Sequence, residues 1–429
     1  MEKNSVKQEN GGRVHKDGVN NHIQEIRLLG MWILLGIAIG IVVGAASTAF
    51  SWVLTAVTDF RAEHPEVFFL LPAAGAAIVF LYRKFAQNDG GTNQVLATIQ
   101  ARDDVLFRSA PLIFISTALT HLAGGSAGRE GAAIQLGGSI GNQIGKWIRL
   151  DDADRHMIVM CGMSAAFAAL FGTPMAAAIF SLEVTSVGVM YYAALMPCVI
   201  ASLVASHLAG MLGVQAEAFR VMDIPEITVL TCAKMLAVAI SCAAISMVFC
   251  MALQGVGKLY EKWLKNPYVR AAAAGCLVIV ITEALQTDVY MGAGAGLIQK
   301  AVEQGQADYF SFFWKILLTA ITMKAGFKGG EIVPAFCVGA TFGCVAGQIL
   351  GISPSFCAAA GMISVFCGVT NCPITSVLIA FEMFGFEGET FYLAAVAVSY
   401  AFSGHYSLYK EQRIVYSKYK AVYVNDRTK

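Results

Sequence analysis

The sequence predicts an all-α polytopic membrane protein built from two similar halves, with broken and half-length helices. Composition is the first observation that predicts it, because 57% of the 429 residues are hydrophobic and only 14% are charged. A soluble domain has about 45–50% apolar and about 25% charged residues. The second observation is a series of apolar stretches suited to cross about 30 Å of hydrocarbon. The third is a set of motifs that recurs in the second half of the chain.

Composition also excludes several function classes. The net charge of +1 gives no global positive field, so nucleic acid is not expected as a partner. The 11 cysteines lie in apolar runs without any C-x-x-C pair, which is typical of free thiols that act as small hydrophobic residues. Zinc-ligand spacing is not found, so we expect no metal and no cofactor. Residues 1–26 are polar, so no cleaved signal peptide is expected.

Apolar stretches run along nearly the whole chain, and several are shorter than a perpendicular membrane span. Glycine or proline breaks others, as at Gly172-Thr173-Pro174 and Asn371-Cys372-Pro373. Backbone left unpaired at membrane depth is tolerated only inside the protein or along a wet cavity. The breaks therefore indicate a transport pathway. The stretches are 31–53, 68–82, 157–182, 190–212, 229–253, 271–285, 311–323, 333–350, 356–381 and 391–402.

Lysine and arginine gather at both ends of the chain, for example Arg13 and Lys16 near the start and Lys418 and Lys420 near the end. The positive-inside rule then predicts that both termini are cytoplasmic, in a multi-pass protein of the cell (plasma) membrane. We expect a polar tail over residues 1–26, one transmembrane transport domain over 27–417 and a second tail over 418–429. The halves of the domain are expected at about 30–215 and 228–405.

An internal repeat is the most informative feature of the organisation. Three anchors recur with an offset of 199 residues, and they are Gly162 and Gly361, Pro174 and Pro373, and Glu183 and Glu382. A second motif, upstream of these, places Glu130 and Glu331 201 residues apart. Such repeats are common in secondary transporters, where the substrate lies between the halves at broken helices. The sequence alone leaves open whether the halves are parallel or inverted.

The glycine-rich run at residues 124–131 precedes a predicted helix over 132–148. Glycines let the backbone expose its N–H groups, and a helix start adds unpaired donors and a positive dipole end. This combination binds anions without a full charge that would hold them too tightly. Glu130 lies in the first turn, so its carboxylate can occupy the anion site, leave it when an anion enters, and carry a proton. The alternative is an acid that only complements the dipole, but intramembrane carboxylates are usually functional.

These motifs resemble those of a known family. Gly128-Arg129-Glu130-Gly131 resembles the GREGP motif of the CLC family of chloride channels and anion/proton antiporters. Residues 330–334 (Gly-Glu-Ile-Val-Pro) resemble its GxFxP motif, and residues 91–95 lie where the family has GSGIP. The resemblance runs in the same order from about Met31 to about Tyr416, and it is most specific at the first motif.

The resemblance implies a homodimer with one pathway per subunit, inverted-topology halves, and an anion site lined by helix amides and a tyrosine hydroxyl. It implies that fluoride or chloride and H⁺ are transported across the lipid bilayer. Glu130 would be the external gate and proton carrier. The residues implied to bind the anion are Thr92, Asn93, Gly128, Arg129, Gly131, Ile332, Val333 and Tyr406, with Tyr400 as the alternative tyrosine.

The chain departs from the family pattern at several positions. Thr92 replaces serine, and Val95 and Ala132 stand where the motifs have proline. Glu331 occupies a normally apolar position, whereas Val184 stands where the antiporters carry an inner, proton-accepting glutamate. Glu331 is therefore a candidate for a proton-linked or anion-linked group.

The altered GSGIP segment and the acid before the x-x-Pro resemble the fluoride-exporting branch of the family. Fluoride is small, strongly hydrated and basic enough to accept strong hydrogen bonds, so a hydroxyl or a protonatable carboxyl suits it. Against this branch, Ala132 is not the residue expected there, and Thr92 is a conservative change from the serine of the chloride-type motif. We therefore expect fluoride/proton antiport, with chloride/proton antiport or a passive chloride channel as the alternative.

Two other readings stay open. Residues 124–128 fit the GxSxG pattern of an intramembrane serine hydrolase, with His121 and His405 available, although that motif follows a strand and here an apolar helix precedes it. A receptor or structural membrane protein without transport is the other. We expect a transporter rather than an enzyme. Glu183 and Glu382 end apolar helices at equivalent places, either as capping acids or as a proton relay.

Overall fold

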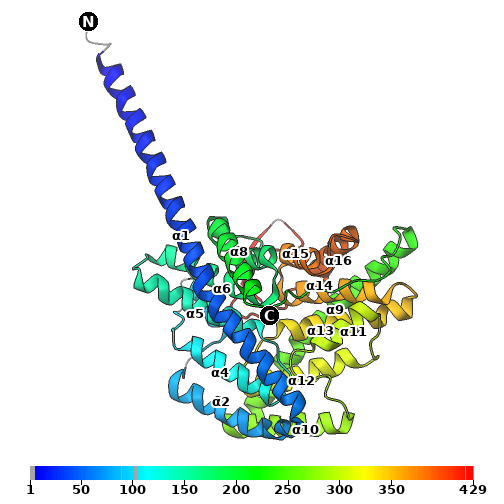
Figure 1. Cartoon of the computed structure of the whole chain (residues 1–429). Coiled ribbons are helices and arrows are strands. Elements are labelled where there is room, and N and C mark those ends of the chain that lie inside the picture. The colour runs from blue at the N-terminus through cyan, green and yellow to red at the C-terminus, as the bar shows by residue number, and fades with distance from the viewer. Residues whose placement is uncertain (1–4, 88, 101–103, 421, 429) are drawn as a thin grey trace.

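The computed structural model describes residues 5–87, 89–100, 104–420 and 422–428, with side chains described from residue 24 onward. The described residues form sixteen α-helices, two short 3-10 helices and three short strands (Figure 1). The helices of the first half are α1 (Ser5–Glu63), α2 (Leu71–Phe85), α3 (Thr92–Ile99), α4 (Ser109–Leu122), α5 (Glu130–Trp147), α6 (Asp152–Phe171), α7 (Pro174–Glu183) and α8 (Leu195–Met211). Those of the second half are α9 (Val229–Trp263), α10 (Pro267–Leu285), α11 (Ala295–Gln304), α12 (Ser311–Ala325), α13 (Ile332–Leu350), α14 (Pro354–Thr370), α15 (Pro373–Phe384) and α16 (Glu389–Phe402).

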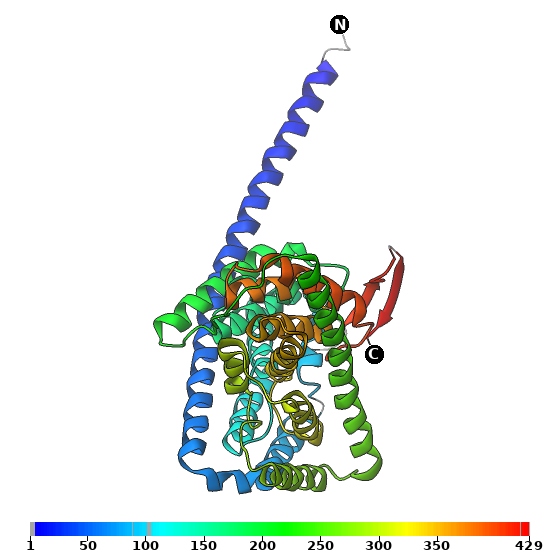
Figure 2. The same ribbon diagram turned by 90° about the vertical axis from the view of Figure 1, so that its right-hand side faces the viewer.

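The two sets of helices make matching contacts. α1 packs against α4, α6 and α8, and α9 packs in the same way against α12, α14 and α16. α5 packs against α6 as α13 does against α14. In Figure 2, α1 and α9 run along opposite flanks of the molecule. α2 and α10 pack against each other at the end of the molecule where α1 and α9 finish. The predicted all-α fold of two similar halves, with broken and half-length helices, is confirmed.

Membrane-crossing character is uneven among the described helices. Six spans are long and apolar enough to cross a bilayer, whereas α4, α7, α14, α15 and α16 are shorter apolar helices. The predicted stretches 157–182 and 356–381 each divide into two helices. Gly172 at φ 69° and Asn371 at φ 57° end α6 and α14 in the left-handed conformation, and a proline then starts the next helix.

The central helices approach each other closely through glycines. Gly137 and Gly162 place α5 against α6, and Gly339 and Gly361 place α13 against α14. A Cβ at any of these four positions would overlap the facing carbonyl group. The starts of α5 and α13 are consequently buried, whereas α1 and α10 leave much of their surface exposed for contact with lipid.

Glu183 and Glu382 each cap a helix of the other half. The Glu183 carboxylate accepts hydrogen bonds from the amides of Ile374 and Thr375 at 3.1 and 2.9 Å and from the Thr375 hydroxyl at 2.7 Å. The Glu382 carboxylate accepts from the amides of Met175 and Ala176, both at 2.8 Å. Each acid thus satisfies donors at the start of the equivalent helix, where no intrahelical acceptor is available. This geometry matches capping acids, and it joins α7 to α15.

A small sheet was not predicted from the sequence. β1 (Ser186–Val187) pairs in parallel with β2 (Arg413–Tyr416), which pairs antiparallel with β3 (Tyr423–Arg427). Strands this short lack an alternating apolar pattern that sequence reasoning can detect. The hairpin returns the end of the chain to the body of the protein, where the Thr428 hydroxyl donates to the Tyr409 carbonyl at 2.7 Å.

Removal of the Glu183 carboxylate should destabilise the junction between the halves. In Glu183→Ala, the buried amide of Thr375 and the partly buried amide of Ile374 lose their acceptor, and an unpaired buried amide costs about 1–3 kcal/mol. We expect a lower thermal unfolding temperature in detergent. Glu387→Ala changes an exposed carboxylate and is the control. Equal unfolding temperatures for the two variants would contradict the capping role.

Candidate functional site

The loops before α5 and α13 are joined by an antiparallel β-bridge between Gly128 and Gly330. The Gly128 amide donates to the Gly330 carbonyl at 2.7 Å, and the Gly330 amide donates to the Gly128 carbonyl at 2.8 Å. A reciprocal pair of this kind requires a local two-fold relation between the two loops. The bridge therefore brings the two repeated motifs together at the boundary of the halves.

The bridge also corrects the register of the repeat. Sequence comparison paired Glu130 with Glu331, but the bridge pairs Gly128 with Gly330, an offset of 202 residues. Helix α5 begins at Glu130 and α13 at Ile332, which keeps the same offset. Glu331 is thus the structural counterpart of Arg129, because the two glycines before α13 shift the motif by one residue.

The Glu130 carboxylate lies between the starts of α5 and α13. Glu130 is fully buried, with 0% of its surface exposed. Its Oε1 accepts from the Arg129 amide at 3.0 Å, and its Oε2 accepts from the Val333 amide at 3.2 Å. The carboxylate therefore uses donors from both halves, at two positive helix ends. Any anion that replaced it would meet the same donors.

Glycine is required at Gly330 by the closeness of this carboxylate. A Cβ at that position would lie 2.6 Å from Oε2 of Glu130 and 2.7 Å from the Gly131 amide nitrogen. Gly128 is under the same constraint, since a Cβ there would also overlap the Glu130 carboxylate. The glycines of both motifs thus make room for one carboxylate.

Thr92, predicted from the segment at residues 91–95, contacts the start of α5. Its hydroxyl donates to the Gly131 carbonyl at 3.1 Å, which places the start of α3 against the start of α5. Gly91, at φ 65°, turns the chain into α3. The neighbouring Asn93 points elsewhere, because its Oδ1 accepts from the Glu411 amide at 3.4 Å.

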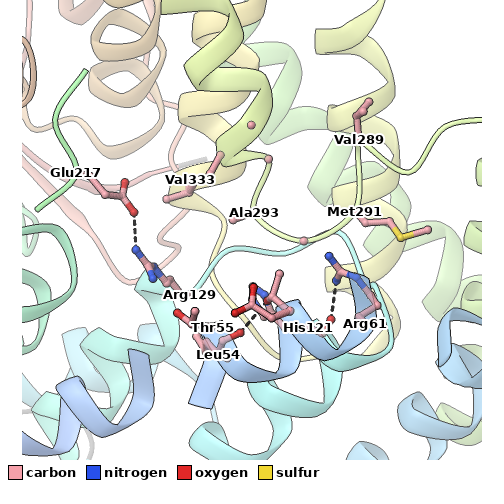
Figure 3. Close-up of a pocket in the computed structure, with 16 residues that line it drawn as sticks. Leu54, Thr55, Arg61, His121, Arg129, Glu217, Val289, Met291, Ala293 and Val333 are labelled. Atoms are coloured by element: carbon pink, nitrogen blue, oxygen red, sulfur yellow. Dashed lines mark hydrogen bonds and ion pairs between the residues drawn. The ribbon is translucent and has the colours of Figure 1, made fainter. Parts of the chain in front are cut away.

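A cavity of about 350 Å³ lies at the end of α1, beside Arg129 and Val333 (Figure 3). We call it the α1 cavity. Arg61 donates to the His121 carbonyl at 2.6 Å, and Nε2 of His121 lies 3.2 Å from the Gly128 carbonyl oxygen. Arg129 forms an ion pair with Glu217, which Figure 3 shows at the side of the cavity away from Arg61.

Arg61 and Lys315 were missed by sequence reasoning. Lys315 is fully buried, and its ammonium donates to the carbonyls of Tyr290 and Gly292 at 3.0 and 2.7 Å. A lone lysine inside the apolar stretch 311–323 is the signal that could have found it. Gly292 belongs to the loop that lines the α1 cavity, so Lys315 holds this loop. The Gly292 amide also donates to the Gly125 carbonyl at 3.1 Å, which joins the loop to the segment before α5.

The tyrosines of the C-terminal segment differ in burial. Tyr409 is 3% exposed, and its phenol interacts electrostatically with Glu331 and Glu130. Tyr406 is half-buried, and Tyr400 lies beneath the Lys418 ammonium, 4.5 Å from the ring centroid. Tyr409 was missed because a buried tyrosine in irregular backbone gives no periodic signal.

Glu331 and Val184, the two positions predicted to bear on proton transfer, both have hydrogen-bond partners. Glu331 pairs with Lys324, with Nζ and Oε1 3.1 Å apart. Val184 is buried, and its carbonyl accepts from Nε2 of Gln412 at 2.9 Å. A carboxyl side chain is therefore available at 331 and not at 184.

The geometry around Ser126 argues against the hydrolase reading. Its hydroxyl lies 3.1 Å from the hydroxyl of Thr319, and its amide donates to Thr322 at 3.3 Å. Nε2 of His121 faces the Gly128 carbonyl instead. A serine nucleophile needs a base within hydrogen-bond reach, and Ser126 is engaged with threonines.

Comparison with known proteins identifies relatives of this chain. A family model described as voltage gated chloride channel matches residues 74–404. A chloride/fluoride channel protein of Pseudomonas syringae pv. tomato is 33% identical over 396 residues, which cover 90% of this chain and 87% of that protein. The H(+)/Cl(-) exchange transporter ClcA of Vibrio cholerae is 25% identical over 407 residues, 86% of each chain.

Solved structures give the same result for the fold. A CLC-type fluoride/proton antiporter is similar with a TM-score of 0.85 and 31% identity, covering 90% of this chain and 98% of that one. A slow cyanobacterial Cl⁻/H⁺ antiporter is similar in fold with a TM-score of 0.74 and 18% identity, covering 87% and 94%.

The space that Gly330 leaves for the Glu130 carboxylate can be tested directly. In Gly330→Ala the new methyl group would displace the carboxylate, and overpacking of this kind costs about 1–3 kcal/mol. We expect a lower unfolding temperature and, in a structure of the variant, no hydrogen bond from Val333 to Glu130. Gly210→Ala is the matched control, since no atom lies within 4 Å of its Cβ position. An unmoved Glu130 side chain would refute the argument.

Proposed function

The chain belongs to the family of voltage-gated chloride channels, and on that premise we propose that it exports fluoride by fluoride/proton antiport with Glu130 as the outer gate. Halide transport is common to its relatives, which are chloride/fluoride and proton-coupled chloride transporters. The observation that carries the proposal is the Glu130 carboxylate held by amides of both halves at 3.0 and 3.2 Å.

The proposed cycle uses Glu130 in two states. In the structure its carboxylate accepts hydrogen bonds from the amides at the starts of α5 and α13. A halide that reaches these amides competes with the carboxylate, and protonation of Glu130 weakens its hold on them. The proton-bearing side chain then leaves the site to the halide. Exchange of one for the other couples movement of the anion to movement of H⁺.

Fluoride is favoured over chloride by two features. The solved relative with 31% identity is a fluoride/proton antiporter, and the Pseudomonas syringae relative is named for both halides. The proposed donors are the hydroxyls of Thr92 and Tyr409 and the protonated carboxyl of Glu331. Thr92 contacts the start of α5, and Tyr409 interacts electrostatically with Glu331 and Glu130. Fluoride accepts stronger hydrogen bonds than chloride, so donors of this kind favour it. Chloride transport, by antiport or through a passive channel, is the alternative.

Antiport requires a proton route to the cytoplasmic side. Val184 has no titratable group, whereas Glu331 has one and is partly buried, with 19% of its side chain exposed. We propose that Glu331 provides the inner proton site. The α1 cavity is lined by Arg129 and Val333, which flank Glu130. With Glu130 as the outer gate, we propose that this cavity opens outward.

Assembly and location are proposals of the same standing. We propose a homodimer with one pathway in each subunit, in the cell (plasma) membrane, with both termini cytoplasmic. Met175 and Ile374, at equivalent positions of α7 and α15, are 47% and 50% exposed and offer apolar surface for a partner subunit. Cysteine cross-linking at Met175 in membranes tests this assignment.

Glu130 should be required for proton coupling. We expect proteoliposomes loaded with fluoride to release it while taking up H⁺, and to release chloride far more slowly. In Glu130→Gln the side chain cannot carry a proton, so H⁺ uptake should be abolished while fluoride flux continues. A fluoride electrode and external pH are recorded together. Uphill proton movement by this variant at the wild-type rate would contradict the gate.

Fluoride over chloride selectivity in the same experiment decides the substrate. Efflux of both halides at equal rates would favour the chloride alternative. Fluoride efflux without H⁺ uptake in the unmodified protein would favour a passive channel. Glu387→Gln, which changes an exposed acid, should behave as the unmodified protein.

The tyrosine hydroxyl that contacts the halide can be identified by paired variants. The resemblance assigned it to Tyr406, whereas burial and an electrostatic interaction with Glu130 support Tyr409. Loss of one hydrogen bond to an anion costs about 1.5–3 kcal/mol, so we expect Tyr409→Phe to weaken fluoride binding by roughly tenfold or more. Tyr406→Phe should have little effect. Isothermal titration with fluoride measures both, and the reverse order would restore Tyr406.

A further inference from the structure

A second cavity, of about 360 Å³, occupies the place in the second half that the α1 cavity occupies in the first. We call it the α9 cavity. Residues 250–261 of α9 line it, as residues 54–61 of α1 line the first. The end of α12 contributes Lys324, as the end of α4 contributes His121 to the α1 cavity. If the α1 cavity opens outward, the inverted relation of the halves makes the α9 cavity open to the cytoplasm.

Cations dominate the lining of the α9 cavity. Four cationic side chains and one acid, Glu261, are among its lining residues. The cations are Lys258, Arg270, Lys324 and Lys410. An excess of positive side chains around a small cavity concentrates anions there. An exported halide has to enter from the cytoplasm, so a cavity of this charge is suited to load it.

Lys324 is the lining residue that connects this cavity to the halide pathway. Its ammonium lies 3.1 Å from Oε1 of Glu331, and its side chain is 31% exposed. Its stem passes α9 at Gly257, where a Cβ would lie 3.9 Å from Cγ of Lys324. Glu331 directly precedes α13, whose Val333 amide holds the Glu130 carboxylate.

Other charged or titratable groups near Glu331 are engaged differently. Glu331 interacts electrostatically with Cys250 of α9, with Lys328 of the loop before α13, and with Tyr409. The Lys328 ammonium lies over the Tyr82 ring, 4.0 Å from its centroid. Lys324 is thus the cation within hydrogen-bond distance of Glu331 in the described part of the chain.

We propose that Lys324 holds either the Glu331 carboxylate or a halide from the cytoplasm, and that this choice links halide loading to proton release. The proposal rests on the proposed function. The Lys324 ammonium carries one positive charge, so a halide bound beside the Glu331 carboxylate would leave a net negative charge at a partly buried site, and protonation of Glu331 removes that charge.

The exchange balances in charge and protons. A proton that arrives from the outer side converts the Glu331 carboxylate to the carboxylic acid, which frees Lys324. A fluoride ion from the α9 cavity then pairs with the Lys324 ammonium. When the fluoride moves on toward the Val333 amide, Lys324 draws back the carboxylate of Glu331, and the carboxylic acid loses its proton to the cytoplasm. One fluoride leaves the cytoplasm as one proton enters it.

The test compares Lys324→Met with Lys324→Arg in fluoride-loaded proteoliposomes. In Lys324→Met we expect the H⁺ taken up per fluoride released to fall at least fivefold. We also expect the fluoride concentration for half-maximal efflux to rise roughly tenfold, because one charge-assisted hydrogen bond is lost. Lys324→Arg keeps the cation and should restore both quantities. Lys262→Met, an exposed lysine of α9 outside the cavity lining, is the control.

Glu331→Gln keeps the proposal testable if Lys324→Met does not fold. It permanently removes the negative charge that competes for Lys324, so we expect tighter apparent fluoride binding together with lost proton coupling. Wild-type coupling and half-saturation in Lys324→Met, or weaker fluoride binding in Glu331→Gln, would show that the ion pair is only structural. Absence of fluoride movement by the unmodified protein would instead overturn the proposed function.

Discussion

The antiparallel bridge between Gly128 and Gly330 is the contact on which the rest of the site depends. It fixes two loops from opposite halves at one point, and each loop leads directly into a buried helix. Since both helix starts present unpaired amides, the bridge creates a region of positive potential without a formal charge. The Glu130 carboxylate fills that region because both bridging residues lack a side chain. A side chain at either glycine would therefore displace the Glu130 carboxylate.

The same two-fold relation has different consequences at different positions. At α7 and α15 the symmetry is kept, and Glu183 and Glu382 cap each other's helices. At the bridge it is broken in charge, because Arg129 corresponds to Glu331. Arg129 pairs with Glu217, and Glu331 pairs with Lys324, so the two ion pairs have reversed polarity. An exchanger needs unlike chemistry at its two ends, and the inversion of one ion pair supplies it.

Three cations at or near the α1 cavity already have partners within the protein. Arg61 donates to the His121 carbonyl, and Lys315 donates to two loop carbonyls. Arg129 is engaged by Glu217. Cations with partners contribute field without binding an anion so tightly that it cannot leave. On the proposed function, a halide that replaced the Glu130 carboxylate would then be held by amides and not by an unpaired charge.

The sequence by itself determined the membrane fold, the two halves, the helix breaks at Gly172 and Asn371, and Glu130 at a helix start. These properties follow from local composition, from repeated motifs and from the conformations that glycine and proline impose. Only the tertiary structure decided the register of the repeat at the bridge, the partners of Glu183 and Glu331, and the burial of Tyr409. Those depend on contacts between residues more than a hundred positions apart or on irregular backbone. Linear spacing carries no information about which of several lysines or tyrosines will face a given carboxylate.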